Sequence, residues 1–96
     1  MKLVRDNVPG MYPLAHRYRR ATPTERPLLL RLKLAEELGE VLSAPTRGRT
    51  LEELGDLLDA ADALRAASGW SVAEVDEVRA AKRERLGAFQ EGWMVE

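Results

Sequence analysis

Hydrophobic side chains recur at helical spacing over most of the chain and divide it into three predicted helices. From Thr24 onward the apolar residues stand three and four positions apart, and no strand-like alternation of comparable strength competes. The preceding segment contains three prolines and a glycine that exclude one continuous helix: Pro9, Gly10, Pro13 and Pro23. We therefore expect an all-α fold, a small helical bundle with an irregular N-terminal arm and a C-terminal tail, in one domain over residues 1–96.

The first predicted helix begins near Thr24, accepts Pro27 in its first turn and ends at about Leu42, before Pro45 and Gly48. One of its faces carries an apolar stripe that we expect in the core, formed by Leu30, Leu34, Leu38 and Val41. Further apolar residues widen the stripe, so this helix should be covered on more than one side: Leu28, Leu32 and Ala35.

The second predicted helix begins at Thr50, which has capping-box spacing to Glu53, and ends near Ser68 and Gly69. One apolar stripe consists of Leu51, Leu54, Leu58 and Ala61. A second series is apolar in its later part and should face a neighbouring helix: Glu53, Asp56, Ala60, Ala63, Leu64 and Ala67. Two carboxylates directed at another helix are costly unless they meet cations or a metal, and a capping role for Glu53 is compatible with metal ligation.

The third predicted helix begins at Ser71, again with a capping box to Glu74, and ends at Leu86 and Gly87. Trp70 and Val75 have the spacing of a hydrophobic staple, and the tail residues Trp93 and Met94 should pack across the bundle or a partner subunit. The apolar stripe of this helix continues into two cations in the series Val72, Val75, Val78, Lys82 and Arg85. These cations are either snorkelling side chains at the core edge or a grip on phosphates.

Two pairs of acids, each spaced three residues apart, stand on successive predicted helices: Glu37 with Glu40, and Glu53 with Asp56. A short connection makes the two helices antiparallel neighbours, so the four carboxylates should converge. Such an all-oxygen cluster suits Mg²⁺ or Mn²⁺, whereas the absence of cysteine and the single His16, which we expect at the surface, make zinc unsuitable. A solvated acidic face is the alternative interpretation of the first helix alone.

Charge is segregated along the chain although the formal net charge is only -1. The segment 1–33 is basic, 34–77 is strongly acidic, and 78–96 is slightly basic. An acidic centre between basic flanks is suited to binding a cation and then a polyanion, or to intramolecular pairing. We expect no internal repeat. We also expect no membrane-spanning segment, because no apolar run exceeds three residues, and no signal peptide, because Met1 is followed by charged residues. The cytoplasm is the expected location.

Three motifs in order resemble the MazG-like all-α nucleoside triphosphate pyrophosphatases. Glu36-Glu37-Leu38-Gly39-Glu40, followed after twelve residues by Glu53-Leu54-Gly55-Asp56, is similar to the E-E-x-x-E…E-x-x-D signature of that superfamily. The segments 2–9 (KLVRDNVP) and 82–89 (KRERLGAF) resemble the two ends of a small branch related to phosphoribosyl-ATP pyrophosphohydrolases.

The resemblance implies hydrolysis of a nucleoside triphosphate between the α and β phosphates, giving a monophosphate and pyrophosphate, as a housekeeping activity of a homodimer. It implies that Mg²⁺ is held by Glu37, Glu40, Glu53 and Asp56. Glu36 would orient or deprotonate the attacking water. The phosphate-binding residues would be Lys82 and Arg85, together with Lys2 and Arg5.

Departures from the family pattern stand at four positions. Gly39 and Gly55 occupy helix positions where better helix formers are usual, and either close approach of the two helices or drift in a degenerate copy would account for them. Leu86 and Ala88 replace an arginine and a glycine of the family ending. A different class of function also fits the residues: in a non-enzymatic helical module, the basic and aromatic segment 16–20 would contact nucleic acid or a protein.

Overall fold

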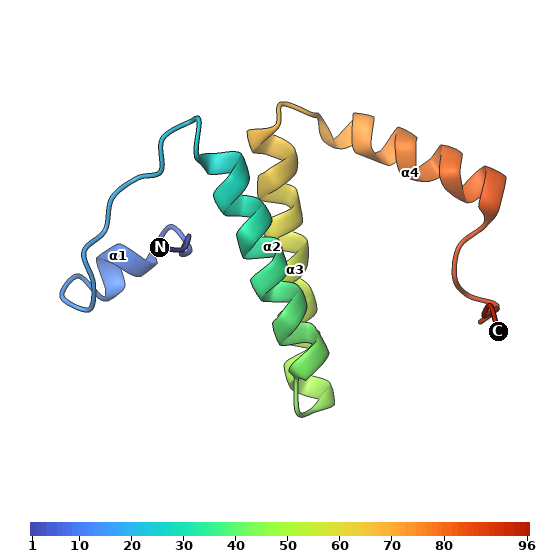
Figure 1. Cartoon of the computed structure of the whole chain (residues 1–96), viewed down its shortest axis with the longest axis horizontal. Coiled ribbons are helices and arrows are strands. Elements are labelled where there is room, and N and C mark those ends of the chain that lie inside the picture. Colours follow the sequence, from blue (N-terminus) through green and yellow to red (C-terminus); the bar gives the residue numbers. More distant parts are fainter.

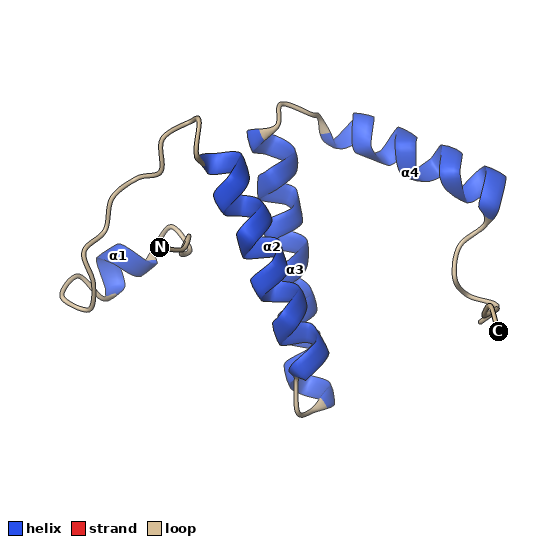
Figure 2. Cartoon of the chain, viewed as in Figure 1, coloured by secondary structure: helices blue, strands red, loops and turns tan.

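The computed structural model describes residues 1–96 and is entirely helical. Four helices follow one another, with no strand (Figures 1 and 2): α1 (Val8–Met11), α2 (Arg26–Ser43), α3 (Arg47–Ala67) and α4 (Val72–Leu86). The predicted fold class, with three main helices between an N-terminal arm and a C-terminal tail, is confirmed. The arm is less irregular than predicted, because it contains the single turn α1.

An antiparallel hairpin of α2 and α3 forms the centre of the molecule, and theirs is the one extensive helix–helix contact (Figure 1). Its interior holds two apolar and two acidic buried residues: Leu30, Ala60, Glu37 and Glu53. The predicted inward face of α3 is confirmed at most positions, with Asp56, Leu64 and Ala67 half-buried and Ala63 exposed. The other apolar stripe of α3, from Leu51 to Ala61, lies on the outside.

The N-terminus of α2 lies two residues later than predicted. The Glu25 N–H donates to Thr22 Oγ1 (3.2 Å), and the Thr22 N–H donates to Glu25 Oε1 (2.9 Å). This reciprocal turn directs the chain into the helix, which begins at Arg26 and carries Pro27 in its first turn as predicted. The helix ends at Ser43, next to the predicted end at Leu42.

The predicted start of α3 at Thr50, with a capping box to Glu53, is wrong. The helix begins at Arg47, because Thr46 adopts the extended backbone of an N-cap and its side chain accepts the Arg49 N–H at 3.1 Å. Thr50 Oγ1 instead donates to the Thr46 carbonyl (2.9 Å). Glu53 therefore has no capping role, and its carboxylate faces α2 without that competing interaction.

Helix α4 begins with the predicted capping box, in which the Glu74 N–H donates to Ser71 Oγ and the Ser71 N–H donates to Glu74 Oε1, both at 3.1 Å. It ends at Leu86 and is capped by Gly87, whose φ of 80° lies in the region that favours glycine. The helix extends away from the hairpin (Figure 1), with Val72 and Val78 exposed. Within one chain, therefore, α4 does not complete a bundle.

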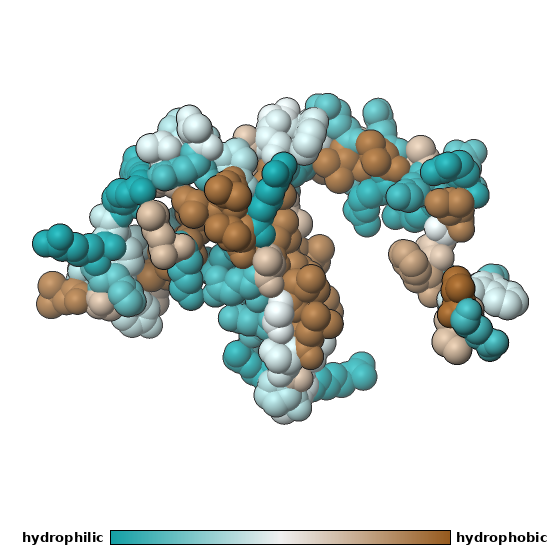
Figure 3. Space-filling model, in the orientation of Figure 1, coloured by the Kyte–Doolittle hydropathy of each residue, from teal (hydrophilic) through white to brown (hydrophobic).

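A large share of the apolar surface faces outward. Hydrophobic atoms gather along the hairpin and on α4 in Figure 3, and the exposed side chains there include Leu28, Leu32, Leu58 and Val78. Trp93 is 89% exposed, so the prediction that the tail packs across its own bundle is wrong. None of the helices combines the length and the hydropathy needed to cross a membrane.

Candidate metal centre

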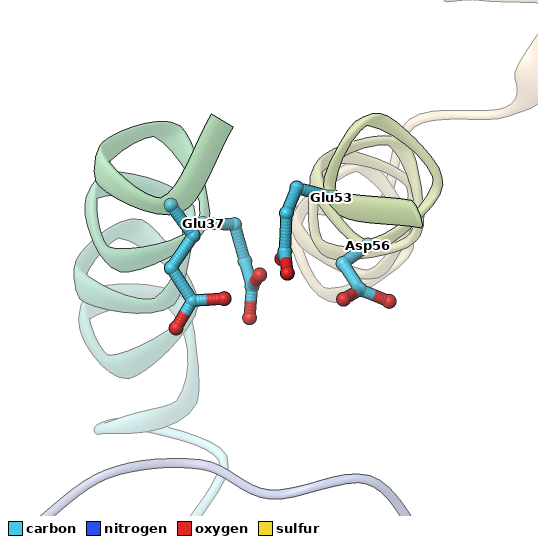
Figure 4. Close-up of side chains that lie close together, drawn as sticks. Glu37, Glu53 and Asp56 are labelled. Carbon is cyan, nitrogen blue, oxygen red and sulfur yellow. The ribbon is translucent and has the colours of Figure 1, made fainter. Parts of the chain in front are cut away.

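Four carboxylates from α2 and α3 meet in the half of the hairpin nearest the loop that joins the two helices. Glu37 and Glu40 stand one turn apart on α2, and Glu53 and Asp56 stand one turn apart on α3. One oxygen from each of the four lies within 4.8 Å of the others. Figure 4 shows Glu37 on one helix and Glu53 and Asp56 on the other, with the Glu53 carboxylate between the helices and all three carboxylates on the same side of the hairpin. The predicted convergence is confirmed.

Two of these acids are buried, and in each only one of the two carboxylate oxygens has a partner. Glu37 is 6% exposed and Glu53 is 5% exposed, and the Oε2 atom of each has no hydrogen-bond partner. Buried polar atoms are nearly always paired, since an unpaired one keeps its desolvation cost. The two unpaired oxygens and the all-carboxylate donor set fit a hard divalent cation. The cluster could thus hold a metal ion.

A basic side chain contacts each of the two buried acids from one turn earlier on its helix. Lys33 Nζ lies 3.2 Å from Glu37 Oε1, and Arg49 Nη2 lies 3.0 Å from Glu53 Oε1. Burial disfavours the charged form of Lys33, but its pairs with Glu37 and Glu36 outweigh this and raise its pKa. Neither cation was among the predicted site residues.

The signal that sequence analysis missed is a short repeat. Residues 33–40 (KLAEELGE) and 49–56 (RTLEELGD) share a basic residue, two glutamates, Leu-Gly and a final acid at identical spacing. The expectation of no internal repeat is therefore wrong for these two segments. Because α2 and α3 are antiparallel, equivalent residues of the two copies reach the same cluster from opposite helices.

The acids of the cluster repel one another in the metal-free chain. A carboxyl–carboxyl hydrogen bond with Glu40, which has no ion-pair partner, is the main cause of a raised pKa at Glu53, and burial and repulsion from Glu40 and Asp56 add to it. Arg49 opposes this shift without cancelling it. The cluster thus retains an excess of negative charge that a divalent cation would neutralise.

Glu36, the residue predicted to act on water, lies beside the cluster and is paired with two lysines. Its Oε1 accepts from Lys2 Nζ (3.1 Å), and its Oε2 accepts from Lys33 Nζ (3.4 Å). The hydrogen bond from Lys2, together with Lys33, lowers the pKa of Glu36 despite partial burial. The carboxylate is therefore ionised at neutral pH and able to accept a hydrogen bond from water.

The two predicted phosphate-binding residues of the N-terminal arm reach the cluster, whereas the two on α4 do not. Arg5 donates to Asp56 and, at 2.8 Å, to Asp59, while Lys2 contacts Glu36. Lys82 and Arg85 lie on α4, which stands away from the hairpin (Figure 1). The prediction that they approach the same site is not met within one chain.

Close approach of the helices does not explain the glycines of the acidic motif. A Cβ atom added at Gly39 or Gly55 would meet no atom within 4 Å. The predicted explanation is therefore wrong, because both positions lie on open faces of the hairpin. Neither contact nor backbone conformation requires glycine at these two positions.

The basic segment 16–20 is partly occupied by contacts within the chain. Arg19 pairs with Glu25, and this pair, followed by the hydrogen bond from the Thr22 backbone, lowers the pKa of Glu25 to about 2. His16 is exposed, as predicted, with its ring edge-on to Tyr18 at a centroid distance of 6.2 Å.

A small open hollow adjoins the cluster at the loop end of the hairpin. Its volume is about 160 Å³, and it is lined by Glu40, Ser43, Ala44, Pro45, Arg49 and Glu53. Pockets for drug-sized ligands usually occupy roughly 300–1,000 Å³. The hollow beside the acids therefore offers room for small ligands but is too small for a whole nucleotide.

Comparison of the chain with protein-family models, with curated proteins and with solved structures found no match.

Proposed function

We propose that this protein is a Mg²⁺-dependent nucleoside triphosphate pyrophosphohydrolase, with Mn²⁺ as a possible substitute, acting on the nucleotide pool of the cytoplasm. The observation that carries the proposal is the four-carboxylate cluster with two buried, unpaired oxygens at its centre. Carboxylates take up this arrangement at a cost that a bound cation removes. The resemblance of the acidic motifs to the MazG-like superfamily supplies the reaction.

The residues around the cluster have complementary tasks in this proposal. Glu37, Glu40, Glu53 and Asp56 hold Mg²⁺, which neutralises charge on the phosphates and lowers the pKa of water when bound. Glu36 is ionised and oriented by two lysines, so it can accept a hydrogen bond from the water that cleaves the linkage between the α and β phosphates. The negative charge that develops as this linkage breaks requires nearby cations.

Lys2 and Arg5 provide those cations on the N-terminal side. Both side chains are more than half exposed and reach the acids from a segment without regular structure. Neutralisation of the acids by a cation weakens their hold on Lys2 and Arg5, because the attraction depends on the carboxylate charges. The two basic groups then become available to the phosphate oxygens of a nucleotide.

A second copy of the chain completes the site in this proposal. A compact chain of this mass exposes about 5,500 Å², whereas this chain exposes 8631 Å². The excess, roughly 3,000 Å² per chain, exceeds what a standard-size interface takes from each partner. A homodimer would cover the outer apolar faces of α2 and α3 and bring Lys82 and Arg85 of one copy to the acidic cluster of the other.

A nucleotide panel with product identification tests the proposed reaction. Each common ribo- and deoxyribonucleoside triphosphate is incubated with the full chain and Mg²⁺, and products are followed by ³¹P NMR. We expect one or more to give a monophosphate and pyrophosphate, with no turnover in EDTA or in Asp56→Asn. Orthophosphate as the first product would contradict α–β cleavage.

The panel also separates the alternative function. An inactive chain that binds single-stranded nucleic acid in a salt-sensitive manner, equally in Glu37→Gln, would indicate an interaction module using segment 16–20. The ion pair of Arg19 with Glu25 leaves fewer free cations in that segment. We therefore favour the enzyme.

A further inference from the structure

The two buried acids of the cluster are held in the same way. Each uses its Oε1 to contact a cation four residues earlier on its own helix, Lys33 for Glu37 and Arg49 for Glu53. Each leaves its Oε2 buried and unpaired. The same division between one satisfied and one free oxygen thus occurs twice, on two helices.

Helix geometry makes these cations effective clamps. A residue four positions earlier lies on the same helix face, one turn toward the N-terminus, and draws one oxygen in that direction. Each cation has a second anchor, since Lys33 also lies 3.4 Å from Glu36 and Arg49 lies 2.8 Å from Glu52. Rotation of either buried carboxylate would break an ion pair.

We propose that Lys33 and Arg49 are positioning residues of the cation site. Each fixes one oxygen of a buried glutamate so that the other oxygen is presented to the metal. The proposal rests on the proposed function, because it takes the cluster to be a metal site, and it adds two residues that act through the carboxylates of the cluster. Polar partners behind metal ligands commonly contribute about 10- to 100-fold to metal affinity.

A simpler role for these cations predicts the opposite effect. If Lys33 and Arg49 only neutralise the acids, they compete with a metal, and their removal should tighten metal binding through Coulombic attraction. If they position the ligands, removal should weaken binding because the carboxylates lose their orientation. The sign of the change therefore decides between the two roles.

Calorimetric titration of the full chain with Mn²⁺ alone measures this sign. We expect Lys33→Met and Arg49→Met each to weaken binding about 10-fold or more, and Lys33→Arg and Arg49→Lys to restore most of the affinity. Arg31→Met is the matched control, because Arg31 is exposed on the same helix as Lys33 and forms no ion pair. Circular dichroism of each variant establishes that the helices are intact.

Unchanged or tighter binding in both methionine variants would overturn the positioning role. Arg49 is 58% exposed, so Arg49→Met carries the test if Lys33→Met fails to fold. No Mn²⁺ binding by the unsubstituted chain would instead remove the metal site, and the proposed function with it. Weaker binding without rescue by Lys33→Arg or Arg49→Lys would also count against positioning, because a clamp requires only a cation of similar reach.

Discussion

Glu37→Gln should stabilise the metal-free protein while removing its response to Mg²⁺. Glutamine keeps the shape of the side chain but replaces one oxygen by an amide nitrogen, which can donate to the surrounding carboxylates. The substitution also removes one of four like charges whose oxygens lie within 4.8 Å. At an effective dielectric constant near 20, one such pair repels by about 3 kcal/mol.

The gain is limited by the ion pair that Glu37 loses. Lys33 lies 3.2 Å from Glu37 Oε1 but keeps its contact with Glu36 in the variant. The oxygen without a partner carries a desolvation cost of about 1–3 kcal/mol, and we take that range as the net stabilisation. For a domain of this size each kcal/mol raises the melting temperature by about 4–8 °C.

Thermal unfolding followed by circular dichroism at a fixed protein concentration tests this prediction. In EDTA the variant should melt several degrees above the unsubstituted chain, and millimolar Mg²⁺ should reverse the order by stabilising only the latter. Glu77→Gln is the control, since Glu77 is exposed and forms no ion pair. A Glu37→Gln variant that melts lower in EDTA would refute the reasoning, because Glu37 would then be a satisfied partner of Lys33.

Three further predictions concern other parts of the chain. Gly55→Ala should stabilise α3 by about 1 kcal/mol, since a Cβ meets no atom there; a lower melting temperature would show that this face is covered. Because Arg19 lowers the pKa of Glu25 to about 2, the ionised Glu25 stabilises the folded chain fully above pH 4.5 and loses this effect as the pH falls toward 2. The difference in melting temperature between the unsubstituted chain and Glu25→Gln should therefore shrink from pH 4.5 to pH 2, and a constant difference would contradict this prediction. Mixing inactive Glu37→Gln with inactive Lys82→Gln should restore partial turnover if α4 acts on the partner's cluster, whereas no recovery after confirmed subunit exchange would exclude a shared site.

The sequence predicts the hairpin and its acids well because both follow from local rules. Helical spacing of apolar residues identifies α2 and α3, and a short connection makes them antiparallel, which suffices to bring Glu37 and Asp56 together. The predicted start of α3 was wrong because Thr46 and Thr50 are both of a residue type that suits an N-cap. Only the extended backbone of Thr46 in the folded chain decides between them.

Other features depend on tertiary contacts that one sequence does not specify. The place of α4 relative to the hairpin is not determined by its own amphipathic pattern, so the distance of Lys82 from the cluster was not predictable. The contacts of Lys33 with Glu37 and of Arg49 with Glu53 could have been predicted from the sequence, because the two cations stand at the same spacing in two similar segments. The repeat was missed because its two copies differ at four of eight positions, the first three and the last, and share only the central Glu-Glu-Leu-Gly.

Direct titration of the metal-free chain with Mg²⁺, beside Asp56→Asn, tests the central claim that the carboxylate cluster is a cation site. Asp56 is half-buried and contributes one of the four converging oxygens, and its amide counterpart keeps the same shape. We predict a saturable binding isotherm for the unsubstituted chain and a large loss of affinity in Asp56→Asn. Equal binding by the two proteins, or none by either, would contradict the account.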